Sequence, residues 1–387
     1  MISSAESGPA ITASAPRKAT IAAATGQASA ADVKAGDWDL SVGGIINAFY
    51  TRTHCSGSQA VGGLALATQA LGCGGGDGRT VIGNGLLPNA LVTSVKGTQE
   101  GIDIGATLMI GAAASSDDAI GNNSNVDVRQ GFLTFGTKDA GTVKLGRDYG
   151  LFGQSAILGD MTLFGAGAPV AATQRNRVTL GHIGAGYTYL GTYGQLSYTT
   201  PALSGFSGTV ALVSPVDASG TTYVGRTSPQ LQAMASFAFT GGKVWAGLKS
   251  QKFDDPAGAG FTMNGAEIGG SATLGDFGLL ANVQSGKGLG VLSDGDSGPR
   301  KQTNYLVQGT FQVTPKAKLG LNWGESRLRD GVAGTDLRSN ANITGGLYFA
   351  LTRSLTLTGE LSHTTSKDVA GDTAKLDGVA AGAILFF

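Results

Sequence analysis

The sequence has little charge, little proline and no long hydrophobic run. Only 14% of its 387 residues are charged, whereas a soluble domain carries about a quarter, so much of the surface need not face water. Proline contributes only 10 residues, which argues against a proline-rich disordered chain. No run of about eighteen apolar residues occurs, which excludes transmembrane helices.

Cysteine is nearly absent, and charges of the two signs balance. With 27 basic and 27 acidic residues, the chain gives no reason to expect a nucleic-acid partner. The spacing of Cys55 and Cys73 excludes a CxxC-type metal or redox site. In an oxidising compartment they would close a long loop with a disulfide, and two unrelated reduced thiols are the alternative.

Glycine, by contrast, is abundant at 64 residues, without a collagen-like triplet repeat. From Asp37 onward the residues alternate with a period of two. Leu319, Leu321 and Trp323 fall on one face, opposite Asn322 and other polar or small residues. We therefore expect an all-β fold, a transmembrane antiparallel β-barrel whose outer face meets lipid and whose inner face is polar.

Short turns and longer loops alternate along the chain, as they do at the two rims of such a barrel. Longer loops are expected near 54–88, 251–262 and 287–302, among others. The count is sixteen strands if residues 149–190 form one long connection. Residues 1–36 read as the remnant of a secretory leader or as a disordered tail, and residues 37–387 as the barrel.

The stretch from Leu145 to Gly167 breaks the alternation. It is rich in apolar residues and glycine, and Asp160 is the one acid in its central part. A mostly apolar connection can pack against the inner wall of a barrel and hold a single carboxylate in place. Charges of opposite sign across a narrow pore would orient dipolar solutes there.

Several motifs resemble those of Gram-negative general porins, the trimeric sixteen-stranded family. They are VRQGFLTFGTKDAGTVKLGRDYG at 128–150, LGDMTLFG at 158–165 and the terminal Phe387. The resemblance implies that residues 149–190 are an inward-folded third loop that narrows the lumen. It also implies a homotrimer in the bacterial outer membrane, in contact with lipid and lipopolysaccharide, that passes small hydrophilic solutes and needs no cofactor.

The same resemblance assigns residues to the constriction. Asp160 matches the loop acid, and Phe164 stands where a second acid is expected, so the loop is thinly charged. The assembly machinery would read Phe387. The remaining candidates for the constriction are Arg129, Asp127, Arg147, Arg175 and Arg177. Asp160 is expected to face Arg129 across the pore.

Other chemistry finds weak support in the sequence. GDSGP at 295–299 copies part of a serine-protease motif, but nothing places a histidine beside Ser297. In the same loop, 287–302, Asp294 and Asp296 are spaced like part of a calcium site, with a solvated loop as the alternative. His182 has no second metal-type ligand nearby, so we expect it to be a satisfied or lumen-facing histidine, and no metal site is expected.

The expected function is passive diffusion of small hydrophilic solutes and ions. A substrate-selective porin for small organic anions is one alternative, with Arg129, Arg175 and Arg177 forming a basic constriction. A barrel that acts as an adhesin or structural sheath is another, and conductance would distinguish it.

Overall fold

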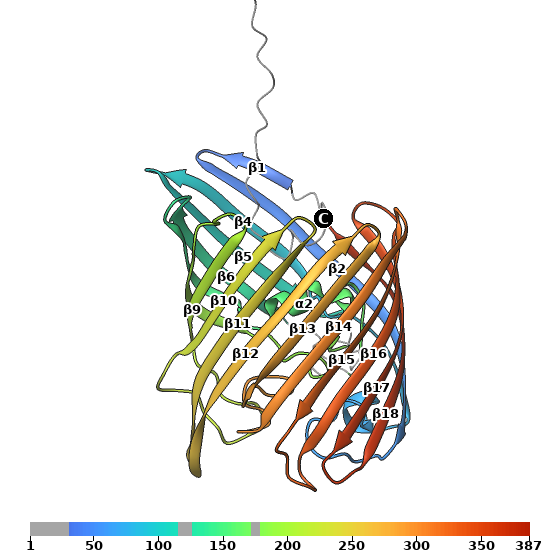
Figure 1. The fold of residues 1–387 in the computed structure, drawn as a ribbon. Coiled ribbons are helices and arrows are strands. Elements are labelled where there is room, and N and C mark those ends of the chain that lie inside the picture. Colours follow the sequence, from blue (N-terminus) through green and yellow to red (C-terminus); the bar gives the residue numbers. More distant parts are fainter. Residues whose placement is uncertain (1–30, 115–125, 172–178) are drawn as a thin grey trace, which may run out of the picture.

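The computed structural model describes residues 31–114, 126–171 and 179–387, and these residues form one antiparallel sheet of eighteen strands (Figure 1). Two short strands, β1 (Ala31–Ala35) and β3 (Gly78–Gly83), pair with β2. The other sixteen form the wall of a closed barrel. They are β2 Trp38–Gly57, β4 Asn89–Gln99, β5 Ile102–Ala112, β6 Val126–Thr137, β7 Gly141–Tyr149, β8 Thr192–Thr199, β9 Phe206–Val213, β10 Gln230–Phe239, β11 Gly242–Asp255, β12 Gly258–Leu274, β13 Phe277–Lys287, β14 Lys301–Thr314, β15 Ala317–Leu328, β16 Leu337–Ala350, β17 Leu355–Asp368 and β18 Thr373–Phe386.

The barrel closes because its last strand pairs with its first. β18 pairs with β2 from Ala374↔Gly57 to Phe386↔Ile45, and Phe387 exchanges two backbone hydrogen bonds with Gly44. Each other wall strand pairs with the next along the chain. The predicted all-β barrel of sixteen strands is confirmed, and the terminal phenylalanine lies at the seam.

The two faces of the wall have opposite chemistry. On β15, Leu321 is 57% exposed whereas its neighbour Asn322 is 1% exposed. This pattern inverts that of a soluble protein, in which the apolar side chain would be covered. The period-two pattern thus assigned the faces of β15 correctly, and the outer face carries a belt of exposed apolar side chains.

Connections at one rim are short, and those at the other rim include the long ones. The turn from β4 to β5 uses Glu100 and Gly101 at φ of 51° and 80°, a left-handed pair typical of a two-residue hairpin turn. At the other rim, residues 58–88 contain helix α1 (Gln69–Gly72), and residues 150–191 contain α2 (Gln154–Gly159) and the 3₁₀ helix η2 (Met161–Phe164). None of the described helices is long and apolar enough to cross a membrane.

The loop expected at 251–262 is instead a strand hairpin. β11 and β12 continue through this range and are joined at Pro256 and Ala257. Phe253 and Phe261 face each other across the pair, with ring centroids 5.0 Å apart, and this stacking extends the hairpin. The hairpin of β1 and β2 likewise begins at Ala31, before the expected boundary at Asp37.

The apolar belt leads to a test of the outer face. We expect Leu321→Arg, in the middle of β15, to lower the free energy of unfolding in phospholipid bilayers by about 2–4 kcal/mol, because lipid cannot solvate the guanidinium there. Leu274→Arg, at the end of β12, should cost about 1 kcal/mol or less. Equal losses at the two sites, measured by urea titration, would contradict a lipid-facing belt.

Candidate functional site

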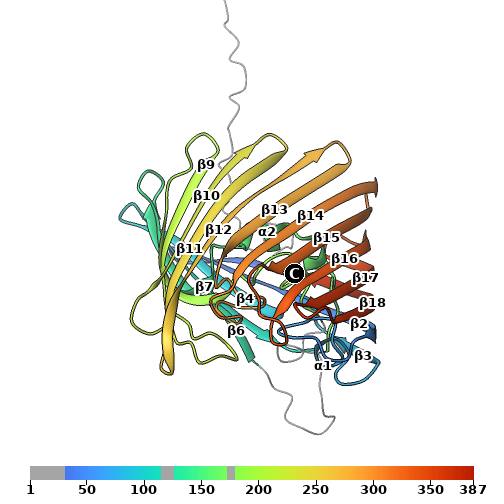
Figure 2. The ribbon, with the colours of Figure 1, turned by 60° about the horizontal axis from the view of Figure 1, so that its bottom comes forward.

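Residues 150–191 connect β7 to β8, and Figure 2 places their helix α2 within the ring of strands. Gly153 precedes α2 with φ of 81°, a conformation that glycine adopts without a Cβ clash. Asp160 starts η2, and its side chain accepts a hydrogen bond from the backbone N–H of Thr162 at 2.9 Å. The acid in this apolar segment therefore has a local structural role.

Wall side chains accept hydrogen bonds from backbone N–H groups of this connection. Glu360 on β17 accepts from Ala166 and Gly167, each at 2.7 Å. Glu267 on β12 accepts from Gly153 at 2.8 Å. Further acceptors are Gln232 on β10, Gln284 on β13, Gln308 on β14 and Ser326 on β15. Irregular buried backbone needs such partners, so these side chains fix the connection against β10 to β17.

Asp160 is 1% exposed and uses both carboxylate oxygens in contacts. Oδ1 accepts from Thr162 Oγ1 at 2.8 Å and from Asn322 Nδ2 at 3.0 Å. Oδ2 accepts from the Tyr187 hydroxyl at 2.7 Å and lies 3.2 Å from His182 Nδ1. The network joins both halves of the connection to β15.

Burial by itself would raise the pKa of Asp160, because it penalises the charged carboxylate. The neighbouring His182 and the hydrogen bonds from Tyr187 and Thr162 outweigh burial and lower this pKa below its ordinary value. Burial and the adjacent Asp160 carboxylate raise the pKa of Tyr187 well above its ordinary value. Asp160 is thus held as an anion inside the protein.

These contacts correct the expectation that Asp160 faces Arg129 across the pore. The carboxylate is enclosed by its own connection and by β15, and no described contact joins it to Arg129. His182, expected to be satisfied or lumen-facing, is fully buried beside Asp160. The physical reason is that a buried carboxylate needs several donors, which tertiary structure supplies here.

Arg129 and Asp127 lie on the inner face of β6, two residues apart, as the alternation predicts. Arg129 Nε donates to Asp127 Oδ2 at 2.8 Å, and the arginine side chain is only 6% exposed whereas that of Asp127 is 43% exposed. A small cavity of about 30 Å³ lies beside this arginine, between β6 and the connection. It is also lined by Leu86, Tyr149, Gln154, Leu158 and Tyr189.

The remaining constriction candidates lie in different parts of the structure. Arg147 is exposed on the same face of β7 as Leu145, which is the outer face, and it donates to Thr192 Oγ1 at 3.1 Å. This is a correction, since its alternation with the inward Asp148 excludes it from the lumen. Arg175 and Arg177 lie outside the described residues. Phe164 packs on Phe386 of β18, with ring centroids 5.8 Å apart.

The loop that resembled a catalytic or calcium motif has other contacts. Asp296 accepts backbone N–H groups from Val291, Leu292 and Ser293, and Ser297 Oγ donates to it. Asp294 is buried and paired with Lys249 of β11. Both carboxylates are therefore occupied by protein donors, and the described residues contain no cluster of three or more metal-ligating side chains.

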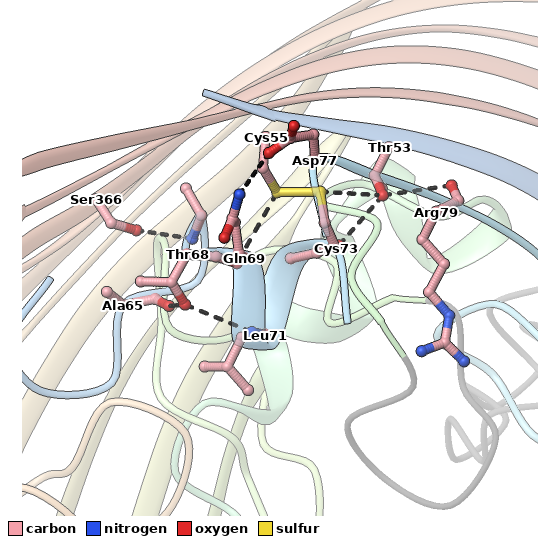
Figure 3. Close-up of a disulfide and its surroundings, with 12 residues drawn as sticks. Thr53, Cys55, Ala65, Thr68, Gln69, Leu71, Cys73, Asp77, Arg79 and Ser366 are labelled. Carbon is pink, nitrogen blue, oxygen red and sulfur yellow. Dashed lines mark hydrogen bonds between the residues drawn. A yellow bond between two sulfur atoms is a disulfide. The ribbon is translucent and has the colours of Figure 1, made fainter. Parts of the chain in front are cut away.

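Cys55 on β2 and Cys73 at the end of α1 form a disulfide (Figure 3). Thr53 Oγ1 donates to the carbonyl of Gly72 at 3.2 Å, which adds a second link between β2 and α1. The Ala171 N–H donates to the carbonyl of Leu71 at 2.8 Å. The disulfide thus holds α1 against the wall at the point where α1 contacts the connection 150–191.

The anchoring residues Glu267, Glu360 and Gln308 were missed by reading the sequence. The signal available was an acid or amide at an inward position of an otherwise apolar or glycine-rich strand. That signal identifies a polar inner face, but it does not distinguish a side chain that meets water from one that binds the backbone of another segment.

A closed barrel with an apolar outer belt and a polar inner face defines a diffusion channel of the bacterial outer membrane. The chain belongs to the Gram-negative porin family, whose sequence model matches residues 19–369. It is an integral outer-membrane protein, and its family and fold are those of a diffusion channel. No curated protein sequence matches it.

Solved structures with this fold are distant in sequence. The outer membrane channel DcaP of Acinetobacter baumannii is 15% identical, with a TM-score of 0.70 over 92% of this chain and 100% of that one. The anion-selective porin from Comamonas acidovorans is 18% identical, with a TM-score of 0.65 over 90% and 100%. Salmonella typhi OmpF is 14% identical, with a TM-score of 0.60 over 92% and 100%.

The Asp160 network predicts a pH dependence of stability. The pKa of Asp160 is lower in the folded than in the unfolded protein, where it is about 4. Its contribution to the free energy of unfolding is therefore present above the unfolded pKa and is lost as the pH falls through the folded pKa. Asp160→Asn should lower the free energy of unfolding at pH 7 by about 1–3 kcal/mol. Urea titrations should show this loss shrinking towards pH 3, whereas Asp103→Asn, at an exposed site, should cost little at either pH. A pH-independent loss would contradict the network.

Removing the disulfide tests the link between β2 and α1. In the double variant Cys55→Ala with Cys73→Ala, the free energy of unfolding should be lower by about 3 kcal/mol, because the unfolded chain is no longer constrained by a loop of this length. Dithiothreitol should destabilise the wild-type protein and leave the variant unchanged. Non-reducing mass spectrometry that finds both thiols free would contradict the pairing.

Proposed function

We propose that the protein conducts small hydrophilic solutes and ions by passive diffusion through a lumen narrowed by residues 149–190. The proposal rests on the row of wall side chains, from Gln232 on β10 to Glu360 on β17, that bind the backbone of the connection. An element anchored in this way occupies part of the barrel cross-section. The remaining path would run beside β4 to β7, where Asp127 is partly exposed on the wall.

The constriction would sort solutes mainly by size. Asp160 is buried, and the charges of Arg129 and Asp127 are paired with each other, so no strong transverse field is built from these residues. On the side of the connection, Leu158 and Phe164 are only partly buried and are apolar. Small polar solutes would pass between an apolar surface and a paired charge.

The protein would assemble as a homotrimer and contact lipid and lipopolysaccharide through its outer belt. The motif resemblance to the trimeric porins supports the trimer. The exposed apolar side chains, such as Leu248 and Leu321, support contact with lipid. Phe387, at the barrel seam, would serve as the assembly signal.

Releasing the connection from the wall tests the constriction. Glu360→Ala removes the acceptor of the Ala166 and Gly167 N–H groups, so we expect a larger single-channel conductance in planar bilayers. Liposome swelling should also become faster with a trisaccharide than in the wild type. Thr356→Ala, on the same strand and face but without a described bond to the connection, is the matched control. If the wild-type protein conducts and Glu360→Ala leaves conductance and size limit unchanged, the connection does not narrow the lumen.

A further inference from the structure

Three lysines lie on the inner face of the wall near the short turns. They are Lys144 near the start of β7, Lys243 near the start of β11 and Lys318 near the start of β15. The neighbouring Val244 and Leu319 are 46% and 47% exposed on the outer face, which fixes the inward direction of the last two lysines. Each ammonium group lies over an inward-facing aromatic ring, 4.9 Å from Phe132, 5.2 Å from Trp245 and 5.4 Å from Tyr348, respectively.

The rings beneath two of these lysines are held in place. Trp245 Nε1 donates to Asn282 Oδ1 at 3.1 Å, and the Tyr348 hydroxyl donates to Glu360 Oε1 at 2.5 Å. A fixed ring keeps the ammonium group on its face through the cation–π attraction. The other N–H donors of the ammonium stay free to meet a solute, because an aromatic face accepts no conventional hydrogen bond.

Lys243 and Lys318 have no carboxylate partner among the described residues, unlike three other lumen cations. Lys144 pairs with Asp148, Arg129 with Asp127, and Lys249 with Asp294. Among the residues that the structure describes, neither Lys243 nor Lys318 forms an ion pair. Both side chains are partly exposed.

Three acids on the inner face are enclosed. Asp160, Glu267 and Glu360 are at most 4% exposed, and each accepts hydrogen bonds from the connection 150–191. At the short-turn rim, Asp39 pairs with Lys34, and Asp103 accepts a hydrogen bond from Thr98. Among the described residues, the charges of Lys243 on β11 and Lys318 on β15 are thus not cancelled by an ion pair.

We infer that Lys243 and Lys318 make the channel prefer small anions, such as chloride and short carboxylates, over cations of the same size. Uncompensated positive charge on the wall of a restricted lumen raises the local concentration of anions and lowers that of cations. This inference rests on the proposed diffusion channel and names its solute class. The residues differ from the arginines that the sequence suggested for a basic constriction.

The reversal potential across a planar bilayer with a KCl gradient measures this preference. At about 0.1 M KCl, where the Debye length is about 10 Å, the wild-type protein should pass chloride in preference to potassium. Lys243→Gln with Lys318→Gln should lower the chloride-to-potassium permeability ratio by about threefold. The difference between wild type and variant should shrink at 1 M salt, where the Debye length falls to about 3 Å.

Two controls separate the effect of the charge from the effect of its position in the lumen. Lys243→Arg with Lys318→Arg keeps both charges over their rings and should keep the wild-type ratio. Lys375→Gln removes an exposed lysine from the outer face of β18 and should also leave the ratio unchanged. If the double glutamine variant does not insert, each single variant should show about half of the shift in reversal potential, since the two sites act separately.

The outcomes distinguish this inference from the channel itself. A wild-type protein without conductance steps would overturn both. Conductance with a preference for potassium, or with a ratio that the glutamine variants leave unchanged, would overturn the anion preference and leave the channel standing. A shift of equal size in Lys375→Gln would overturn the assignment to the lumen lysines.

Discussion

Buried backbone that is neither helix nor strand must find hydrogen-bond partners, and this requirement organises the interior of the barrel. The wall meets it with Glu267, Glu360 and several glutamines, which accept N–H groups of residues 151–188. The inner face is thereby divided. On β10 to β17 many of its polar groups bind the connection, whereas on β6 and β7 they pair with one another, as Arg129 does with Asp127 and Lys144 with Asp148.

The sequence predicted what depends on neighbours along the chain. Period-two alternation placed Leu321 outside and Asn322 inside, because in a strand the side-chain direction follows position alone. The same rule put Arg129 and Asp127 on one face, where they pair. The disulfide of Cys55 and Cys73 was the natural choice for two cysteines in an oxidising compartment.

The predictions that were wrong have different physical causes. Asp160 meets Asn322 of β15, and its burial removes it from the pore that the motif suggested. Arg147 matched a motif, yet one step of alternation places it outside. The hairpin at 251–262 contains glycine, proline and charged residues typical of a loop, but Phe253 and Phe261 pair across it. A contact of high sequence separation decided the position of Asp160, whereas strand alternation placed Arg147 and a cross-strand pair extended the hairpin.

The anchors of the connection have a consequence for how the protein comes together. Every described wall side chain that binds it, from Gln232 to Glu360, comes later in the chain than the connection itself. The connection therefore lacks these hydrogen-bond partners until the second half of the barrel has formed. That half is closed only when Phe387 pairs with Gly44. Non-local contacts of this kind form slowly. In the proposed channel, the lumen would narrow only after the wall has closed.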